Sequence, residues 1–510
     1  MKHGEPQFSR IRSFFWPVHN HELTKFIPTL LLFFLISFNY HFLRISKDPL
    51  IITAPESGVE TLPFLKVWAV LPTAFIITFF YTRLANYFNR ENIFYVIISF
   101  FLLFYLLFLL VLYPNRETLC LHEFADYLQT VMPKGFNGLI AIVRYWIFAL
   151  FYVMSESWSN IMLSLLLWGF ANDVTSFNES RRFYPLLGIG INSSGILAGK
   201  VGFYLSTFTL NDVDISSSKA WDQTLTMFIS VILACGIASI VLYRWLHLYA
   251  YTNRNKAALP LKEIKKKEKM SLRNSFSYIL QSKYLISLAI IVLSYNLVIN
   301  LTEVLWKSQI KELFPKSNDY TAYMSSVTFY VGIIATLTSY FISGNIIRSY
   351  GWKFAAYITP VIILSTGVAF FYFLFIKQYS TLSASVVILM GMSPLTLTVF
   401  FGTMQNCLSR SAKYTVFDDT KEMAFIPLSA EARFKGKTAI DGIGSRLGKS
   451  GGSLLLQGLL IFFSTPTACI PYITAITILA ICAWFKSIGY LGKKLENIKI
   501  ETIEDIPNKK

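Results

Sequence analysis

Charge is scarce in this sequence. Asp, Glu, Lys and Arg make up 15% of the 510 residues, whereas 54% of the residues are hydrophobic and the mean hydropathy is +0.50. Soluble globular domains contain about 25% charged residues, and their interiors cannot bury this much apolar surface. The composition therefore excludes a soluble protein and predicts an all-α polytopic membrane protein.

Motifs that hold metals or catalyse reactions are absent from the sequence. The six histidines form no HExxH motif. Five cysteines are scattered without any CxxC pair, at Cys120, Cys235, Cys407, Cys469 and Cys482. Gly448-Lys449-Ser450 is out of register for a phosphate-binding loop, because the Walker A pattern requires a glycine where this chain has Ile443. We therefore expect no metal, no cofactor and no catalytic residues. The N-terminus also lacks the features of a cleaved signal or an organellar transit peptide.

Apolar stretches of about 20 residues, long enough to cross a hydrocarbon core of about 30 Å, recur along the chain. Six lie in the first half, at about 26–43, 63–83, 93–113, 139–171, 184–208 and 225–251. Six lie in the second half, at about 284–306, 323–347, 354–376, 382–408, 438–463 and 470–490. This pattern predicts an N-terminal six-helix bundle over 26–251 and a C-terminal six-helix bundle over 284–490. The bundles are joined by a linker at 252–283 and flanked by cytoplasmic segments at 1–25 and 491–510.

Basic residues concentrate between the predicted spans. The linker contains KEIKKKEKM, and further Lys and Arg lie near both termini and in the turns on the same side. Because Lys and Arg favour cytoplasmic loops, the even number of spans puts both termini in the cytoplasm. This topology leaves Arg44, Lys47, Lys307 and Lys311 on the opposite side. The net charge of +17 is thus explained by topology and by an anionic substrate, not by nucleic acid.

The turns that follow the second span of each half are similar. They read TRLANYFNREN and SGNIIRSYGWK. The second resembles the Gly-x-x-x-x-Arg-x-x-Gly loop of the major facilitator superfamily, with one residue fewer between glycine and arginine. Together with the helix number, this favours a major-facilitator-like fold of two bundles around a cavity near the membrane midplane.

A few charged residues lie in or against the apolar spans: Lys66, Glu156, Glu303, Arg446 and Lys449. A charge at the centre of a membrane helix costs about 2.5 to 3.5 kcal/mol, so such residues usually line a cavity or pair with an opposite charge. Here the cations are candidates to hold a polyphosphate, and the carboxylates to pair with them or to take up a proton. Structural roles are open as well. Glu156 can pair with a neighbouring cation, and Glu303 can form a helical ion pair with Lys307. Lys66 and Lys449 can extend to the headgroups.

Several segments resemble the nucleotide transporters, or ADP/ATP translocases, of intracellular bacteria and plastids. They include PFLKVW (63–68), FYVMSESW (151–158), NLTEVLWKSQIK (300–311), KGKTAID (435–441) and LGKSGG (447–452), and the resemblance covers nearly the whole chain. It implies a twelve-helix secondary transporter, not an enzyme, that exchanges external ATP for internal ADP. It also implies transport roles for Lys66, Glu156, Glu303 and Lys449. The missing transit peptide favours the bacterial branch and the bacterial inner membrane.

Departures from the family motifs leave the substrate and its coupling open. This chain has SESW for AELW, ESRRFY for EAKRFY and NLTE for NLVE. Related paralogues import nucleoside triphosphates with protons. Proton-coupled net import of ATP, GTP, CTP and UTP is therefore the alternative, with Glu156 and Glu303 as proton acceptors. A symporter of a non-nucleotide organic anion is the second alternative. The expected partners are the nucleotide or phosphate, the lipid bilayer and, for the alternative, protons; we expect a monomer.

Overall fold

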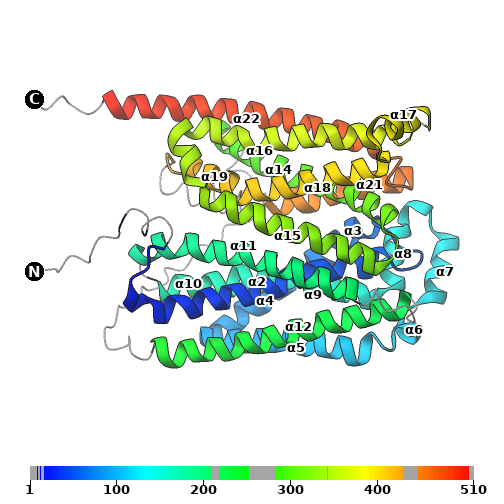
Figure 1. Cartoon of the computed structure of the whole chain (residues 1–510), viewed down its shortest axis with the longest axis horizontal. Coiled ribbons are helices and arrows are strands. Elements are labelled where there is room, and N and C mark those ends of the chain that lie inside the picture. The colour runs from blue at the N-terminus through cyan, green and yellow to red at the C-terminus, as the bar shows by residue number, and fades with distance from the viewer. Residues whose placement is uncertain are drawn as a thin grey trace, which may run out of the picture.

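The computed structural model describes residues 9, 12, 16–175, 177–208, 217–251, 282–341, 343–378, 380–428, 440 and 445–504. Every regular element in these ranges is helical. The helices run roughly along one direction, and the start of α2 and the end of α22 lie at the same end of the molecule (Figure 1). Helices of the first half of the chain lie together on one side, and those of the second half lie on the other.

The first half contains long helices that are interrupted by short π-helical segments. Its main elements are α2 (Leu23–Ile52), α3 (Thr61–Phe64), η2 (Leu65–Val70), α4 (Leu71–Tyr87), α5 (Arg90–Leu107), η3 (Phe108–Leu112), α8 (Asn137–Arg144), α9 (Trp146–Trp158), η5 (Ser159–Leu167), α10 (Trp168–Val174), α11 (Phe177–Phe208), α12 (Ser217–Trp245) and η6 (Leu246–Tyr251). Short elements in its connections are η1 (Asn20–Glu22), α6 (Arg116–Leu119), α7 (His122–Val131) and η4 (Lys134–Phe136).

The second half also contains long helices and a π-helical segment. Its elements are α14 (Lys283–Leu313), α15 (Ser317–Phe341), α16 (Ser343–Ile376), α17 (Ser380–Met390), α18 (Pro394–Ala412), η7 (Lys413–Phe417), α19 (Asp418–Phe425), α21 (Ser445–Phe463) and α22 (Ile470–Glu504). Gly351 interrupts α16 with a φ of +81°, a left-handed conformation that glycine adopts without steric cost. This break lies in the turn SGNIIRSYGWK that the sequence indicated.

In the described part of the chain, ten helices are long and apolar enough to cross a membrane. Each of the twelve predicted stretches corresponds to one or more helices, and the prediction of an all-α polytopic membrane protein is confirmed. Two stretches differ in detail. The run 139–171 is broken at Tyr145, whose φ and ψ of −109° and 47° are not helical. The run 382–408 is broken at Gly391 (φ +66°), and α18 begins only at Pro394. The predicted linker lies almost entirely outside the described residues, and the division into two bundles stays a prediction.

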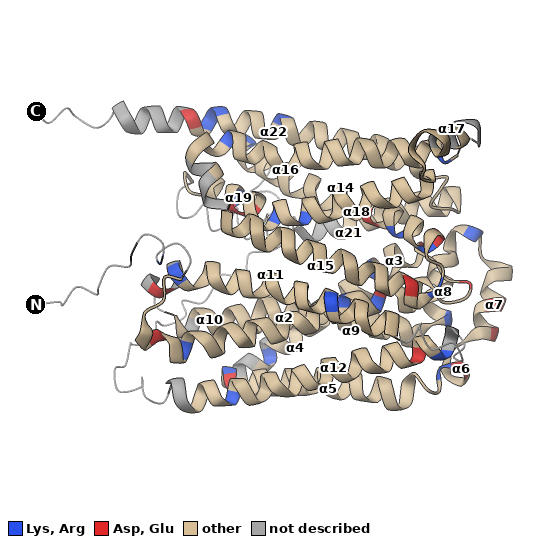
Figure 2. Ribbon diagram, viewed as in Figure 1, with Lys and Arg blue, Asp and Glu red and all other residues tan. Residues whose placement is uncertain are grey.

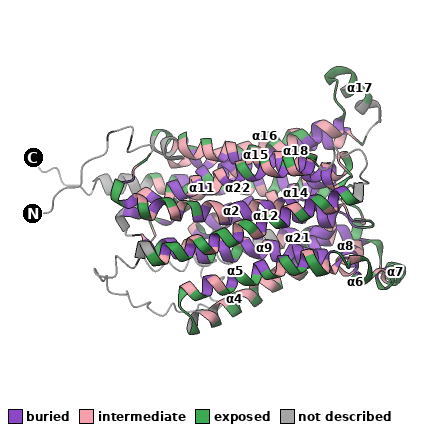
Figure 3. Ribbon diagram, turned by 60° about the horizontal axis from the view of Figure 1, so that its bottom comes forward, coloured by how far each residue is buried: buried purple, intermediate pink, exposed green. Residues whose placement is uncertain are grey.

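The outer surface of the helices is apolar, as a lipid-facing surface requires. Phe75 and Phe79 of α4 and Phe100 of α5 are more than half exposed. Figure 3 shows exposed residues along the outer faces of these helices and buried ones toward the interior. Charged residues on the outer helices lie mainly near their ends, whereas others lie inside the molecule (Figure 2).

Helices α11 and α15 bring the two halves into close contact. A Cβ atom added at Gly199 of α11 would lie 2.6 Å from the carbonyl oxygen of Ser325. One added at Gly332 of α15 would lie 2.7 Å from the backbone nitrogen of Ile196. Both distances are too short for a side chain, so the glycines allow the two backbones to touch, as small residues do at membrane helix interfaces.

Candidate functional site

A network of ion pairs lies inside the molecule and joins the two halves. On α14, the Lys307 ammonium lies 2.7 Å from a carboxylate oxygen of Asp48 on α2. It also lies 3.0 Å from Glu303, one helical turn earlier. Arg410 of α18 lies 3.1 Å from the same Glu303 oxygen. We call Lys47, Asp48, Glu156, Glu303, Lys307 and Arg410 the charged network.

The first half contributes a second ion pair to this network. The Lys47 ammonium pairs with the Glu156 carboxylate of α9. It also lies 4.2 Å from the centroid of the Tyr152 ring, where the negative face of the ring attracts the cation. Lys47 and Asp48 are neighbours on α2, so one turn of this helix connects Glu156 with Lys307.

Several members of the charged network are deeply buried. The side chains of Asp48 and Lys307 are 1% and 4% exposed, and that of Glu156 is 32% exposed. Taking such charges out of water costs several kcal/mol per ion, and close pairing is what offsets this cost. The network therefore has to remain paired, or has to meet a charged ligand, whenever the halves are in contact.

Lys66 makes a separate polar link between the halves. It lies on η2 and donates a hydrogen bond of 2.6 Å to the side-chain oxygen of Asn300 on α14. The Asn300 amide in turn donates to Ser453 of α21 at 2.9 Å. Lys66 also acts electrostatically on Glu303. It therefore points into the molecule, and the expectation that it could extend to the headgroups is wrong.

Helix α21 packs tightly against α14 through its glycines. A Cβ atom at Gly448 would lie 2.7 Å from Asn296 Cβ, and one at Gly452 would lie 3.0 Å from the Asn300 amide nitrogen. Arg446 and Lys449 belong to the same helix. Their side chains lie outside the described part of the structure, so their predicted role in substrate binding stays a prediction.

Of the predicted site residues, Lys66 bonds directly across the halves, and Glu156 and Glu303 belong to the charged network. Glu303 does form the helical pair with Lys307 that its spacing suggested, but this pair is buried and extends to Asp48 and Arg410. Glu156 pairs with a cation, Lys47, as the structural role suggested for it in the sequence analysis requires.

The sequence reasoning missed the other members of the charged network. It placed Arg44, Lys47 and Lys307 outside the spans, and this is wrong, because α2 continues to Ile52 and α14 to Leu313. The apolar residues that follow Asp48, Leu50 to Ile52, were the available signal for the longer first helix. Arg410 lies two residues beyond a predicted span end, and nothing in the sequence linked it to Glu303.

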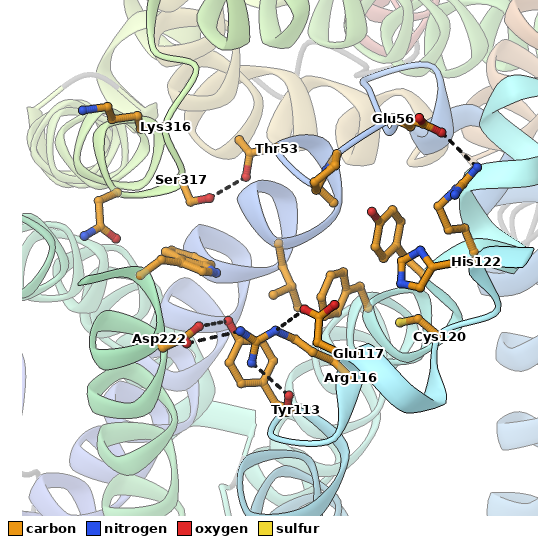
Figure 4. Close-up of a pocket in the computed structure, with 18 of the residues that line it drawn as sticks. Thr53, Glu56, Tyr113, Arg116, Glu117, Cys120, His122, Asp222, Lys316 and Ser317 are labelled. Carbon is orange, nitrogen blue, oxygen red and sulfur yellow. Dashed lines mark hydrogen bonds and ion pairs between the residues drawn. The ribbon is translucent and has the colours of Figure 1, made fainter. Parts of the chain in front are cut away.

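A cavity of about 560 Å³ (Figure 4) lies where α2 ends, at the end of the molecule opposite to the start of α2 (Figure 1). Its wall comes from the end of α2, the segment 113–122, the start of α12 and residues 315–318 of the second half. Arg116 and Tyr113 both bond to Asp222, at 3.2 and 2.6 Å. Arg144 pairs with Glu56 at 2.9 Å. Among the predicted site residues whose side chains the structure describes, Lys66, Glu156 and Glu303, none lines this cavity.

The sequence matches, over residues 1–495, the model of a family described as TLC ATP/ADP transporter. The chain belongs to this family. Membership makes it a multi-pass membrane carrier rather than an enzyme. Among curated relatives of this transporter family, the chain is 44% identical to ADP,ATP carrier protein 1 of Chlamydia muridarum (strain MoPn / Nigg), over 96% of this chain and 92% of the relative. It is 39% identical to the chloroplastic ADP,ATP carrier protein 1 of Arabidopsis thaliana, over 94% of this chain and 75% of the relative.

A solved structure shares the fold of this TLC family member. It is a bacterial homologue of the iron transporter ferroportin in an inward-facing state, with a TM-score of 0.54 and 14% sequence identity. The match covers 91% of this chain and 99% of the other. At this identity the likeness concerns the fold alone.

Proposed function

We propose that this chain exchanges ATP for ADP across a membrane. The observation that carries the proposal is the family match over residues 1–495, together with relatives named ADP,ATP carrier proteins that are 39% to 44% identical. The charged network and Lys66 support it, because Lys and Arg between the two halves provide the charge that holds a polyphosphate. In this proposal Lys66, Glu156, Glu303, Arg446 and Lys449 line the path of the nucleotide.

Transport proceeds by alternating access in this proposal, with the two halves rocking around the network. The described contacts between the halves support a state that is closed at the end opposite to the start of α2. There, Lys311 of α14 donates to the Ser57 carbonyl oxygen at 2.5 Å. Gln457 of α21 donates to the Pro63 carbonyl oxygen at 2.8 Å. These bonds must break when that end opens to admit a nucleotide.

Exchange has an electrical consequence. ATP carries about four negative charges and ADP about three, so each cycle moves one net charge, worth about 2.3 kcal/mol per 100 mV. A membrane potential that is negative inside opposes import, and the ATP and ADP gradients must drive it. Net import of the tetra-anion is harder still, and proton uptake at Glu156 or Glu303 would offset its charge. For this alternative, the pair between Glu156 and Lys47 would have to open to receive the proton.

Uptake of radiolabelled ATP into cells that express the protein tests the proposal. We expect uptake to accelerate at least several-fold when the cells contain ADP, because exchange needs a counter-substrate, and to persist with an uncoupler. Sensitivity to the uncoupler without any need for internal ADP would favour proton-coupled import instead. No uptake of any nucleotide would defeat both functions and leave an organic anion as the substrate. Cells that carry the empty vector are the control.

We further propose that the carrier lies in a bacterial inner membrane as a monomer, with both termini in the cytoplasm. The basic residues of the sequence near both termini support this orientation. The two halves of one chain already enclose the charged network, so no second copy is needed. Fluorescent protein fused to the C-terminus should fluoresce, and alkaline phosphatase fused there should stay inactive. An active phosphatase would reverse the orientation.

A further inference from the structure

Arg44 is a cation in the interior that takes part in none of the ion pairs of the charged network. It lies on α2, three residues before Lys47, within a helix that is apolar enough to span the membrane. Its side chain is partly buried. In the described part of the structure, its guanidinium has no hydrogen bond and no ion pair. An arginine inside a membrane span is costly unless a partner or water meets it. The free guanidinium therefore calls for an anionic ligand.

The surroundings of Arg44 connect it with both halves. It interacts electrostatically with Asp48 on its own helix and with Glu303 and Tyr414 of the second half. Tyr414 is 50% exposed, so it is not packed into the core of the second half. Arg410 lies one turn before Tyr414 and bonds to Glu303. Arg410 thus contacts this carboxylate directly, and Arg44 of the opposite half acts on it electrostatically.

Positive charges outnumber negative ones around Arg44 and Glu303. Five described cations, Arg44, Lys47, Lys66, Lys307 and Arg410, lie with three carboxylates, Asp48, Glu156 and Glu303, which leaves two positive charges. Excess charge of one sign in a low-dielectric interior is unfavourable until a counter-charge arrives. A guanidinium suits a phosphate especially well, because its N–H groups can bind two oxygens at once.

We propose that Arg44 and Arg410 bind the phosphate groups of the transported nucleotide from opposite halves of the carrier. Arg44 supplies the free guanidinium, and Arg410 exchanges part of its bond to Glu303 for the phosphate. The nucleotide thereby bridges α2 and α18, which couples its binding to the approach of the two halves. The inference rests on the proposed function, since it names further residues that hold the same substrate.

Arg44→Gln and Arg44→Lys test this assignment in the ATP uptake assay. We expect Arg44→Gln to raise the KM for ATP at least tenfold, because a neutral amide cannot hold a phosphate. Arg44→Lys should raise it less, since the charge remains while the paired N–H groups are lost. The control is Arg244→Gln, because Arg244 is 57% exposed and pairs with Glu91 at 3.0 Å outside the network. Its KM should stay within twofold of the unsubstituted protein.

Binding to purified protein separates the assignment from a folding defect. ATP should raise the thermal unfolding temperature of the unsubstituted protein, and this rise should shrink markedly in Arg44→Gln while the temperature without ATP stays similar. An unchanged KM and an unchanged ATP-dependent rise would overturn the assignment. So would a loss confined to the maximal rate in both Arg44 variants, because this indicates a structural role. If the unsubstituted protein transports no nucleotide, the proposed function fails first, whatever the variants do.

Discussion

Lys307→Met should destabilise the folded protein by about 3 to 5 kcal/mol, the usual cost of removing one partner of a buried ion pair. Methionine keeps the length of the side chain but leaves Asp48, which is 1% exposed, without its cation at 2.7 Å. Glu303 is affected less, because Arg410 remains 3.1 Å away. Thermal unfolding of the purified protein in detergent measures this effect, and we expect a much lower unfolding temperature and a reduced yield.

A second substitution identifies the cause of this loss. Asp48→Asn removes the carboxylate charge that Lys307→Met leaves without a partner. The double variant Asp48→Asn with Lys307→Met should therefore recover most of the stability. Lys316→Met is the matched control, because Lys316 is exposed and lies three residues beyond the end of α14. This substitution should change the free energy of unfolding by no more than about 0.5 kcal/mol. Full stability of Lys307→Met, or a double variant less stable than the single one, would show that the bond to Asp48 is not what holds α14 against α2.

The free-energy cost of a charge in an apolar stretch was enough to single out three residues that have polar partners inside the molecule. Lys66, Glu156 and Glu303 stand out because a charge in an apolar stretch needs a partner, and the structure gives each of them one. Lys47 and Asp48 escaped this reasoning, because a span of about 20 residues was ended at Leu43. In the structure, α2 has 30 residues and passes through Pro49 before it ends at Ile52. A longer helix turns a pair of apparent loop charges into buried ones.

Contacts between the two halves could not be predicted from the sequence. The pair between Glu303 and Lys307 follows from a spacing of four residues on one helix, and it was anticipated. The bond from Lys307 to Asp48 joins helices more than 250 positions apart, and it depends on how α14 and α2 are placed in depth and rotation. Asn300 is uncharged and gave no signal, although it receives the hydrogen bond from Lys66.

Linking Thr53 to Ser317 should block transport completely and reversibly. The two hydroxyl oxygens lie 2.7 Å apart and join the end of α2 to the start of α15 across the cavity at the closed end (Figure 4). Cysteines at these positions bring their sulfur atoms close enough for a disulfide with little backbone movement. Because alternating access requires this end to open, oxidation of the variant Thr53→Cys with Ser317→Cys should reduce ATP uptake to the background of empty cells.

The chain's own cysteines have to be removed for this experiment. Cys120 lines the same cavity, and although burial raises the pKa of its thiol and slows its reaction, it could still compete for either new cysteine. The background therefore carries serine at all five native cysteine positions. Each single cysteine variant should transport normally after oxidation, and dithiothreitol should restore uptake by the double variant. Uptake at full rate through a demonstrably cross-linked protein would mean that the halves do not separate at Thr53 and Ser317, and the rocking motion would have to be abandoned.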